Sequence, residues 1–556
     1  MRPLEHKLLR LGIIAVVLTG YIYPLTLAIP LLDPDEGLHA AIAQEMVETG
    51  NYLVPRFLGE TFPDKPILYF LAQAVSLRVF GMNEAAIRLP GVLFALFGAW
   101  TTWLCGKRLF DRRVGLLATL ISLTLLLPLC IVQSPVHDIA LVPFTNLLIL
   151  NLWGLRQAPP ERKRKRLIVF ASVAAALSLL TKGLIGVAVV SVGYFIHAIW
   201  QRQLRRDTVQ TFAVILLGGI GFAAPWFWLM ELNQPGYLRY YFVERHFLGY
   251  ATATQTHGSE PWFYYLLPVF AGSLPWVAHA IPAMKELVRD QRRPNRNDAI
   301  RFVLCWFVGG FLFLSIAHSK LVTYVLPLFP AIAILVAFVW NEFLEQRFSE
   351  PCRVRIGRMF AVGTVIGIVA PLLIIACLII TCGFEPSSAT WFMCAMLGLS
   401  SAAILWLFRS GRHLHGITGG AVWLTMLVAC VMNGPMPHIA RSYTHQSLAR
   451  AANGRLGQMQ PVILVGDRSG SFVFYLSADH RRTLRVRGRA FLSPTDALAT
   501  RTREPAELVI PTQDALAECP ELAEVITAGH WVVAKEQIEK TVLLEAKDPP
   551  NADARK

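Results

Sequence analysis

Long apolar runs separated by short polar segments fill the chain up to about residue 434. An α-helix needs about 20 apolar residues to cross a bilayer, and thirteen runs reach or approach that length. The shortest, 167–180, needs support from its neighbours. The runs are 11–32, 88–106, 114–132, 138–155, 167–180, 183–200, 210–230, 262–283, 302–317, 321–340, 359–381, 391–408 and 417–434. The pattern predicts a polytopic α-helical membrane protein with about thirteen transmembrane helices.

The polar segments between the runs predict the orientation of the chain. With the N-terminus in the cytoplasm, every cytoplasmic loop is basic, as the positive-inside rule requires. These loops are 107–113, 156–166, 202–206, 285–301, 341–358 and 409–415. Counting 67–81 (ILYFLAQAVSLRVFG) as a further span would invert the later loops. We therefore expect 67–81 to be an amphipathic helix at the outer interface, with Arg78 on its polar face.

Two long segments and the C-terminal tail then lie on the outer side. The segments are 33–87 and 231–261, and they belong to a transmembrane domain over residues 1–438. The tail contains several strand-like runs and one helix-like run. The strand-like runs are 461–467, 471–476, 507–511, 530–536 and 541–546, and the helix-like run is 514–526. This alternation predicts a periplasmic α/β domain over residues 439–556.

Composition agrees with the membrane assignment. Apolar residues make up 54% and charged residues 16% of the 556 residues, which excludes an ordinary soluble enzyme, a disordered chain and a fibrous protein. The net charge of +15 sits in the short loops, so we do not expect nucleic-acid binding. The nine cysteines form no CxxC pair, which argues against a zinc ribbon or a disulfide framework.

Ionisable residues are sparse on the outer side. Asp33 and Asp35 stand at the mouth of the first span, where either can serve as the N-cap of a helix that ends at Gly50. In the turn Phe62-Pro63-Asp64-Lys65-Pro66 the two prolines restrict the backbone around Lys65. Its ammonium can meet a lipid phosphate, or it can be a surface lysine that reaches the interface.

Further outer residues lie at the ends of spans. Asp138 enters the bilayer at its edge, where a carboxylate is costly unless it is paired. Lys182 lies at a hinge between two spans and can pair with a carboxylate or reach the interface. Lys320 and Tyr324 are four residues apart, which predicts a shared helix face.

The segment 231–261 adds a cluster of cations and histidines, which includes Arg239, Arg245, His246 and His257. The aromatic residues 262–265 indicate an interfacial belt. No sequence feature establishes a cofactor. A divalent metal on His246, His257 and Asp64 stays an alternative, although the spacing matches no HExxH motif.

Together, these carboxylates and cations indicate an outward-facing site for a phosphate-bearing substrate held in the membrane. The residues also carry a family resemblance. PDEGLHAAIAQEM (34–46) and NYLVPRFLGETFPDKPILYF (51–70) resemble the first external loop of the undecaprenyl-phosphate 4-amino-4-deoxy-L-arabinose lipid A transferases. TKG (181–183), PWFYY (261–265) and SKLVTY (319–324) follow in the family's order. These enzymes belong to the GT-C superfamily, which includes protein mannosyltransferase-like enzymes.

The resemblance implies a GT-C fold and an inverting transfer of a sugar from undecaprenyl phosphate to lipid A or lipopolysaccharide. The reaction would take place at the periplasmic face of a bacterial inner membrane, among membrane lipids. It implies a catalytic role for Asp35 and Asp138. For the lipid phosphate and the sugar it implies Lys65, Asp64, Arg56, Lys182, Arg245, Lys320 and Tyr324. The family's EHIQRF-type segment appears as ERHFLGY (244–250), so Arg245 or Arg239 would have to replace the missing arginine.

Two alternatives stay open at this point. A mannosyl-type hexose transferase that acts on protein or polysaccharide would share the same motifs. A transporter or flippase for lipid-linked sugar would show internal repeats and polar groups at mid-membrane, whereas here the charges lie at the outer ends of spans. The acceptor decides the role of Asp35. A lipid A phosphate is already anionic and needs only orientation, whereas a hydroxyl needs Asp35 as a base.

Overall fold

The computed structural model describes residues 3–27, 29–251, 260–283, 286, 294–441, 443–455, 462–465, 470–487, 491–492, 507–511, 531–538 and 541–546. The chain forms two compact units. Unit 1 contains Met1–Leu27, Pro63–Tyr69 and Arg88–Pro435, and unit 2 contains Ala28–Phe62, Phe70–Ile87 and Met436–Lys556. The chain therefore passes between the units several times, and each unit is described by itself.

Unit 1 is helical throughout its described part. It opens with α1 (Pro3–Val17), continued by the turns η1 (Leu18–Ile22) and η2 (Tyr23–Thr26). Its further elements are α4 (Glu84–Leu109, which begins in unit 2), α5 (Arg112–Ser122), α6 (Leu126–Ile131), α7 (His137–Arg156), α8 (Glu161–Lys182), α9 (Leu184–Trp200), α10 (Arg206–Asn233), η3 (Arg239–Leu248), α11 (Gly249–Ala251), α12 (Leu266–Gly272), α13 (Trp276–Ala280), η4 (Ile281–Ala283), α15 (Pro294–Ile316), η5 (Val322–Leu328), α16 (Phe329–Leu344), α17 (Glu350–Cys382), α18 (Ser388–Arg409) and α19 (His413–Asn433).

Helix length and hydropathy confirm a multi-pass membrane protein. Within the described residues, nine helices are long and apolar enough to cross a bilayer, and the α12–α13 pair, bent by 87°, makes a tenth if it counts as one span. The runs predicted at 114–132, 167–180 and 183–200 are also helical, in α5 with α6, α8 and α9. These helices are too short, or carry too much charge, to count as spans by that measure, so the number thirteen stays a prediction.

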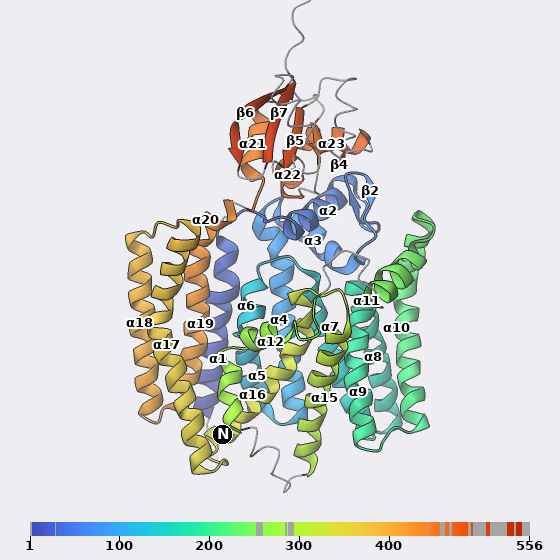
Figure 1. Cartoon of the computed structure of the whole chain (residues 1–556). Helices are drawn as coiled ribbons and strands as arrows, with labels where there is room; N and C mark the ends of the chain where they lie inside the picture. Colours follow the sequence, from blue (N-terminus) through green and yellow to red (C-terminus); the bar gives the residue numbers. More distant parts are fainter. Residues whose placement is uncertain are drawn as a thin grey trace, which may run out of the picture. The chain divides into compact units, whose positions relative to one another are not determined.

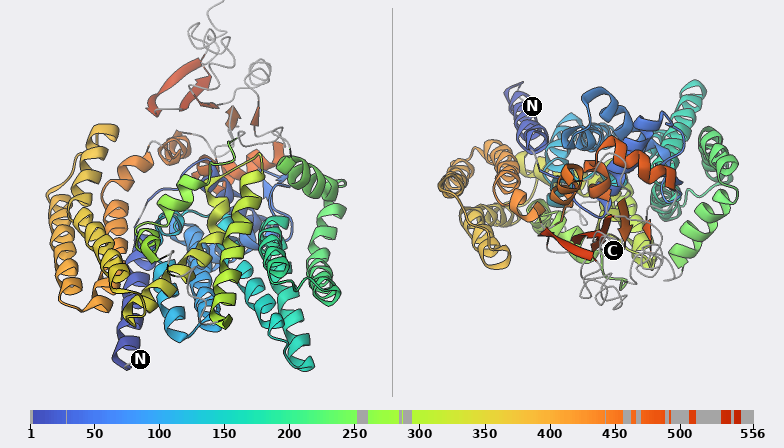
Figure 2. Two further views of the ribbon diagram at one scale, coloured as in Figure 1. Left: turned by 60° about the horizontal axis from the view of Figure 1, so that its bottom comes forward. Right: turned by 90° about the horizontal axis from the view of Figure 1, so that it is seen from above.

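The helices of unit 1 form a row of bundles. Figure 1 shows α17, α18 and α19 beside α1 at one flank, and α8, α9 and α10 at the opposite flank; Figure 2 gives the same order. Between them lie α4, α5, α7, α15 and α16. The spans His137–Arg156 (α7) and Val322–Leu344 (η5 with α16) are the most enclosed of the nine, because 78% of the residues in the most apolar stretch of each are buried. Residues on these two helices are therefore held by rigid surroundings.

The segment predicted as an interfacial helix is α3 (Ile67–Phe80). Its 14 residues are too few to cross a bilayer, as expected. The prediction that α3 has one polar and one apolar face is only partly right. Arg78 is exposed, but the apolar side chains of Val75, Val79 and Phe80 are exposed with it, while Gln73 is fully buried.

Unit 2 contains a mixed five-stranded sheet in the order β4-β3-β5-β7-β6. The strands are β3 (Val462–Val465), β4 (Phe491–Leu492), β5 (Glu507–Pro511), β6 (Trp531–Ile538) and β7 (Thr541–Ala546). β3 pairs in parallel with β4 and β5, whereas β7 pairs antiparallel with β5 and β6. The helix predicted at 514–526 lies outside the described residues. The domain boundary at 439 stays a prediction.

Unit 2 also contains helices and a hairpin from two distant parts of the chain. They are α2 (Asp35–Thr49), the hairpin β1 (Arg56–Phe57) with β2 (Glu60–Thr61), most of α3, and α20 (Met436–Arg441), α21 (Gln446–Arg455), α22 (Gly470–Tyr475) and α23 (Ala478–Arg487).

The strand predicted at 471–476 is wrong, because residues 470–475 form α22. The alternation of SFVFYL resembles a strand, but this segment packs against α2 instead of joining the sheet. The approach is so close that a Cβ on Gly470 would collide with the backbone of Leu38, and a Cβ on Gly37 with the backbone of Ser471. Tertiary packing therefore overrides the local strand preference.

We expect the Gly470→Ala variant to destabilise unit 2. The added methyl group forces two backbones apart, and overpacking of this kind costs about 1–3 kcal/mol. The melting temperature of the detergent-solubilised protein and protease resistance of the tail measure the effect. Gly454→Ala on α21 is the matched control, because nothing lies within 4 Å of a Cβ added there. Equal melting temperatures for the two variants would contradict the close packing of α22 on α2.

Candidate active site

Asp138 is the centre of a buried polar cluster in unit 1. It is the second residue of α7 and is only 5% exposed. Lys182, the last residue of α8, binds its Oδ1 atom, and the hydroxyl of Thr323 donates to its Oδ2 atom at 3.0 Å. The α7 N-terminus adds a favourable dipole for the carboxylate. Asp138 is thus paired, as its position in the membrane requires.

Tyr324 extends this cluster. The Lys182 ammonium lies 4.0 Å from the centroid of its ring, which is a cation–π distance. The side chain of Lys182 is therefore held between a carboxylate and an aromatic face. Of the two roles predicted for Lys182, the structure places it with the carboxylate.

The hinge after Lys182 depends on Gly183. Its φ of 69° and ψ of −142° belong to a region that is essentially restricted to glycine. A Cβ there would also collide with the ring of His246 and the hydroxyl of Tyr241, both in η3. The second external segment consequently packs directly on the α8–α9 hinge.

Both ring nitrogens of His246 lie near backbone carbonyl oxygens, and the neutral ring donates to one of them. Its Nδ1 atom lies 2.7 Å from the Tyr241 carbonyl oxygen, and its Nε2 atom lies 3.4 Å from the Lys182 carbonyl oxygen. Burial lowers the pKa of this imidazole, although the two carbonyls oppose the shift. These contacts assign His246 to the packing of η3 on the hinge.

Asp64 joins η3 to the FPDKP turn. The Tyr240 hydroxyl donates to its Oδ1 atom at 2.5 Å, and the Nη2 atom of Arg245 lies 3.8 Å from its Oδ2 atom. Asp64 directly precedes Lys65, which is half-buried. Arg245 therefore lies near the carboxylate of the residue that directly precedes Lys65 in the chain. Arg239 is 81% exposed and pairs with Glu244 at 3.5 Å instead.

Lys320 differs from its prediction. It lies before η5, not in a helix with Tyr324, so the expected shared helix face is wrong. Its ammonium is buried and donates to the carbonyl oxygen of Glu260 at 2.8 Å and to that of Ala317. Burial lowers the pKa of this lysine. Carbonyl groups therefore already occupy two of its three donors.

Asp35 and Arg56 belong to unit 2. Asp35 is the exposed first residue of α2, whose N-cap is Pro34 with no side-chain cap bond, so the N-cap predicted for Asp33 or Asp35 is wrong. Asp33 instead binds His445 and Ser471. The Nη1 atom of Arg56 donates to the Gly59 carbonyl oxygen at 3.0 Å and so helps to close the β1–β2 hairpin.

The predicted metal ligands do not fit a metal ion. Asp64 is engaged by Tyr240 and Arg245, and His246 by two carbonyl groups. Among the described residues, no three His, Cys, Asp or Glu side chains are grouped to hold an ion. His257 lies outside the described residues.

Sequence reasoning missed two polar partners in unit 1, Thr323 and Tyr240. Thr323 lies inside the SKLVTY motif directly before Tyr324, so the motif itself contained the signal. Tyr240 lies in a run of aromatic residues, where nothing in the local pattern distinguishes it from an interfacial side chain.

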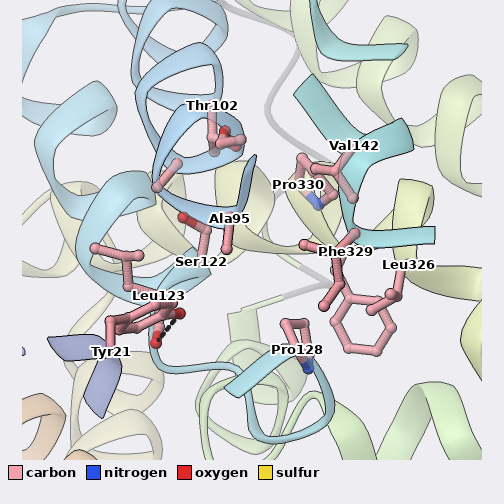
Figure 3. A pocket seen from close by; sticks show the side chains of 13 residues that line it. Tyr21, Ala95, Thr102, Ser122, Leu123, Pro128, Val142, Leu326, Phe329 and Pro330 are labelled. Atoms are coloured by element: carbon pink, nitrogen blue, oxygen red, sulfur yellow. Dashed lines mark hydrogen bonds between the residues drawn. The ribbon is translucent and has the colours of Figure 1, made fainter. Parts of the chain in front are cut away.

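A cavity of about 50 Å³ lies between the spans of unit 1 (Figure 3). Its lining comes from η1, α4, α5, α6, α7, η5 and α16 and is mainly apolar, and the Tyr21 hydroxyl in its wall donates to the Leu123 carbonyl oxygen at 2.9 Å. None of the predicted site residues lines it. Its size and lining indicate a packing gap rather than a sugar site.

Sequence comparison relates the chain to membrane glycosyltransferases. Residues 64–228 match the family model of dolichyl-phosphate-mannose-protein mannosyltransferase. An undecaprenyl phosphate-alpha-4-amino-4-deoxy-L-arabinose arabinosyl transferase from Aeromonas salmonicida is 31% identical over 63% of this chain and 63% of its own length. An enzyme of the same name from Sodalis glossinidius is 32% identical over 61% of this chain and 60% of its own length. The matched part thus spans less than two thirds of these curated relatives.

Structural comparison extends over nearly the whole chain. The crystal structure of ArnT from Cupriavidus metallidurans bound to undecaprenyl phosphate superposes with a TM-score of 0.76. The alignment covers 96% of this chain and 97% of the other, at 20% identity. This likeness establishes the fold.

We expect the Lys182→Ala variant to destabilise unit 1 strongly. It leaves Asp138 buried without its cation, and breaking a buried ion pair costs about 3–5 kcal/mol. Thermal unfolding in detergent measures the loss, and Lys163→Ala, an exposed position on the same helix, is the control. The Asp138→Asn/Lys182→Met double variant should recover part of the stability. A Lys182→Ala protein as stable as Lys163→Ala would contradict the pairing.

Proposed function

We propose that this chain, a GT-C-fold homologue of the undecaprenyl phosphate-aminoarabinose arabinosyl transferases, is an inverting glycosyltransferase that uses a lipid-phosphate sugar donor. Its donor is a sugar on undecaprenyl phosphate, with 4-amino-4-deoxy-L-arabinose as the sugar, and its acceptor is lipid A or lipopolysaccharide. The observation that carries the proposal is the approach of Arg245 to Asp64, which brings a second cation to the turn that holds Lys65.

The leaving group determines which cations the reaction needs. When the acceptor oxygen attacks the anomeric carbon, the bond between this carbon and the phosphate oxygen breaks. Undecaprenyl phosphate then leaves with an additional negative charge. Lys65 and Arg245 stabilise this charge as it develops. Asp64 keeps Arg245 at the turn, and Tyr240 fixes the Asp64 carboxylate.

The other two predicted lysines act differently in this proposal. Lys182 neutralises and orients Asp138, so it serves the carboxylate rather than the phosphate. Lys320 holds the chain before η5 against Glu260 through a backbone carbonyl. Tyr324 remains beside the reacting groups through its contact with Lys182.

Asp35 acts on the acceptor. Because it is exposed at the start of α2, its carboxylate is accessible to a substrate. A lipid A phosphate already carries the attacking oxygen as an anion, so Asp35 then orients the acceptor. If the acceptor is a hydroxyl, Asp35 removes its proton.

The location follows from the loop charges. The basic segments face the cytoplasm, so Asp138, Lys182 and the FPDKP turn lie at the periplasmic ends of the spans. We place the protein in the bacterial inner membrane with its active site facing the periplasm, in contact with membrane lipids. Lipid donor and lipid acceptor both reach such a site by lateral diffusion.

A second candidate is supported by the family model matched at residues 64–228. Its description names mannose transfer to protein. A hexose transferase that acts on protein or polysaccharide would use the same cations and carboxylates. Mass spectrometry of lipid A and of surface glycans from cells with and without the chain separates the two functions.

We expect Lys65→Ala and Arg245→Ala each to lower the rate of sugar transfer about 10²–10³-fold, because each removes a donor to the leaving phosphate. Transfer from undecaprenyl phosphate-linked sugar to lipid A by the purified protein in liposomes measures the rate. Arg239→Ala is the matched control, because this arginine is exposed and, among the described residues, its ion pair is with Glu244. If Lys65→Ala transferred sugar at the rate of Arg239→Ala, the donor site would lie elsewhere.

The Asp35→Asn variant distinguishes the acceptors. With a hydroxyl acceptor we expect a loss of about 10²–10⁴-fold, because the base is gone. With a lipid A phosphate we expect a smaller loss, because the attacking oxygen is already anionic. The same liposome assay, run with each acceptor, measures both. An unchanged rate with both acceptors would rule out a catalytic role for Asp35.

A further inference from the structure

Three residues of unit 2 form a compact polar cluster beside the start of α2. The Oδ2 atom of Asp33 lies 2.7 Å from the Nδ1 atom of His445. The Ser471 backbone N–H donates to the Asp33 Oδ1 atom at 2.9 Å, and the Ser471 hydroxyl donates to Oδ2. The His445 backbone N–H donates to the Ser471 hydroxyl oxygen at 2.9 Å. We call this cluster of Asp33, His445 and Ser471 the tail lock.

The tail lock contains the residue types of a hydrolase triad, but its geometry excludes that role. A nucleophilic serine needs the histidine nitrogen that does not bind the carboxylate. Here the Ser471 hydroxyl lies 3.5 Å from Nδ1, the same nitrogen that binds Asp33. Ser471 is also completely buried and donates its proton directly to the carboxylate. The cluster therefore holds structure and does not perform acyl transfer.

The segment held by the lock is the one that presents Asp35. The backbone N–H of Asp33 donates to the Tyr443 carbonyl oxygen at 2.8 Å, which adds a main-chain tie to the tail. On the other side of Asp35, Glu36 is buried and its Oε2 atom accepts from the Leu32 backbone N–H at 2.8 Å. Asp35 itself stays exposed between these fixed neighbours.

The packing of α2 against α22 adds to these hydrogen bonds. Gly37 lies directly against the backbone of Ser471, and Gly470 against the backbone of Leu38, with no room for a Cβ at either glycine. The first turn of α2 and the first turn of α22 therefore move as one body. Asp33, two residues before Asp35, is thus tied to a residue 438 positions later in the chain.

We propose that Ser471 and His445 are positioning residues for Asp35, and that the C-terminal tail is thereby part of the machinery for sugar transfer. This inference rests on the role proposed for Asp35. The tail lock fixes the position of Asp33. Because the start of α2 is rigid, the position of Asp35, two residues later, is fixed as well, and Asp35 carries the carboxylate that binds the acceptor. Misplacement of a reacting group by about 1 Å can cost about 10²-fold in rate.

The test is a double-mutant cycle between Ser471→Ala and Asp35→Asn in the full-length protein, with liposome-based sugar transfer to lipid A as the assay. We expect Ser471→Ala to lower kcat by about 10- to 100-fold with KM for the lipid donor unchanged. In the Asp35→Asn background, Ser471→Ala should cause no further loss, because it acts only through Asp35. The matched control is Thr483→Ala, which removes a hydroxyl group on α23 outside the tail lock.

A second, more conservative variant keeps the test interpretable if Ser471→Ala fails to fold. Asp33→Asn keeps the size of the side chain and an acceptor for the Ser471 N–H, but it removes the charge that faces His445. We expect the same pattern, namely a lower kcat, an unchanged KM and no further loss in Asp35→Asn. Melting temperatures of all variants show whether each remains folded.

The outcomes separate the two proposals. If Asp35→Asn transfers sugar at the normal rate, the proposed role of Asp35 fails and the inference fails with it. If Asp35→Asn is impaired but Ser471→Ala and Asp33→Asn behave like Thr483→Ala, only the tail lock is overturned. Losses that multiply in the double variants would show general destabilisation and would likewise overturn it.

Discussion

The pairing of Asp138 is the interaction on which the arrangement of the candidate active site depends. A carboxylate at the end of a membrane-spanning helix is stable only if a cation and a hydrogen-bond donor meet it there. Lys182 and Thr323 meet this requirement from α8 and from the start of η5. The start of α7, the end of α8 and the start of η5 must consequently lie close together. The hinge at Gly183 and the packing of η3 on it follow from that fixed point.

The same constraint divides the cations into two groups. Lys182 and Lys320 are buried or nearly so. The ammonium of Lys182 binds a carboxylate, and that of Lys320 donates to two carbonyl oxygens. Arg245 differs from them, because its recorded ion-pair partner Asp64 lies farther away, at 3.8 Å. The cations near this end of the bundle thus differ in how closely the protein's own acceptors hold them. Counting cations along the sequence cannot separate these roles, because the distinction lies in distances.

Much of the fold could be predicted from hydropathy and loop charge. The apolar runs became helices, and the basic loops gave a consistent orientation. The prediction failed where tertiary packing decides. SFVFYL alternates like a strand but forms α22, since Gly470 and Gly37 allow two helices to touch. Lys320 and Tyr324 were placed on one helix face, but the chain before η5 is not helical. Motifs found Asp138, Lys182 and Asp64, whereas Tyr240, His445 and Ser471 have no local signal and depend on contacts between distant segments.

Unit 2 is assembled from pieces at both ends of the chain, and this has a consequence for biosynthesis. The contact between Asp33 and Ser471 joins residues separated by 438 positions. The ribosome synthesises the N-terminal piece first, so the segment with Asp35 exists long before its partners in the tail. Contacts of such large sequence separation form late. A nascent chain that has completed most of its helices therefore still lacks the contacts that hold the start of α2. Unit 2 can therefore complete its packing only once translation is nearly finished.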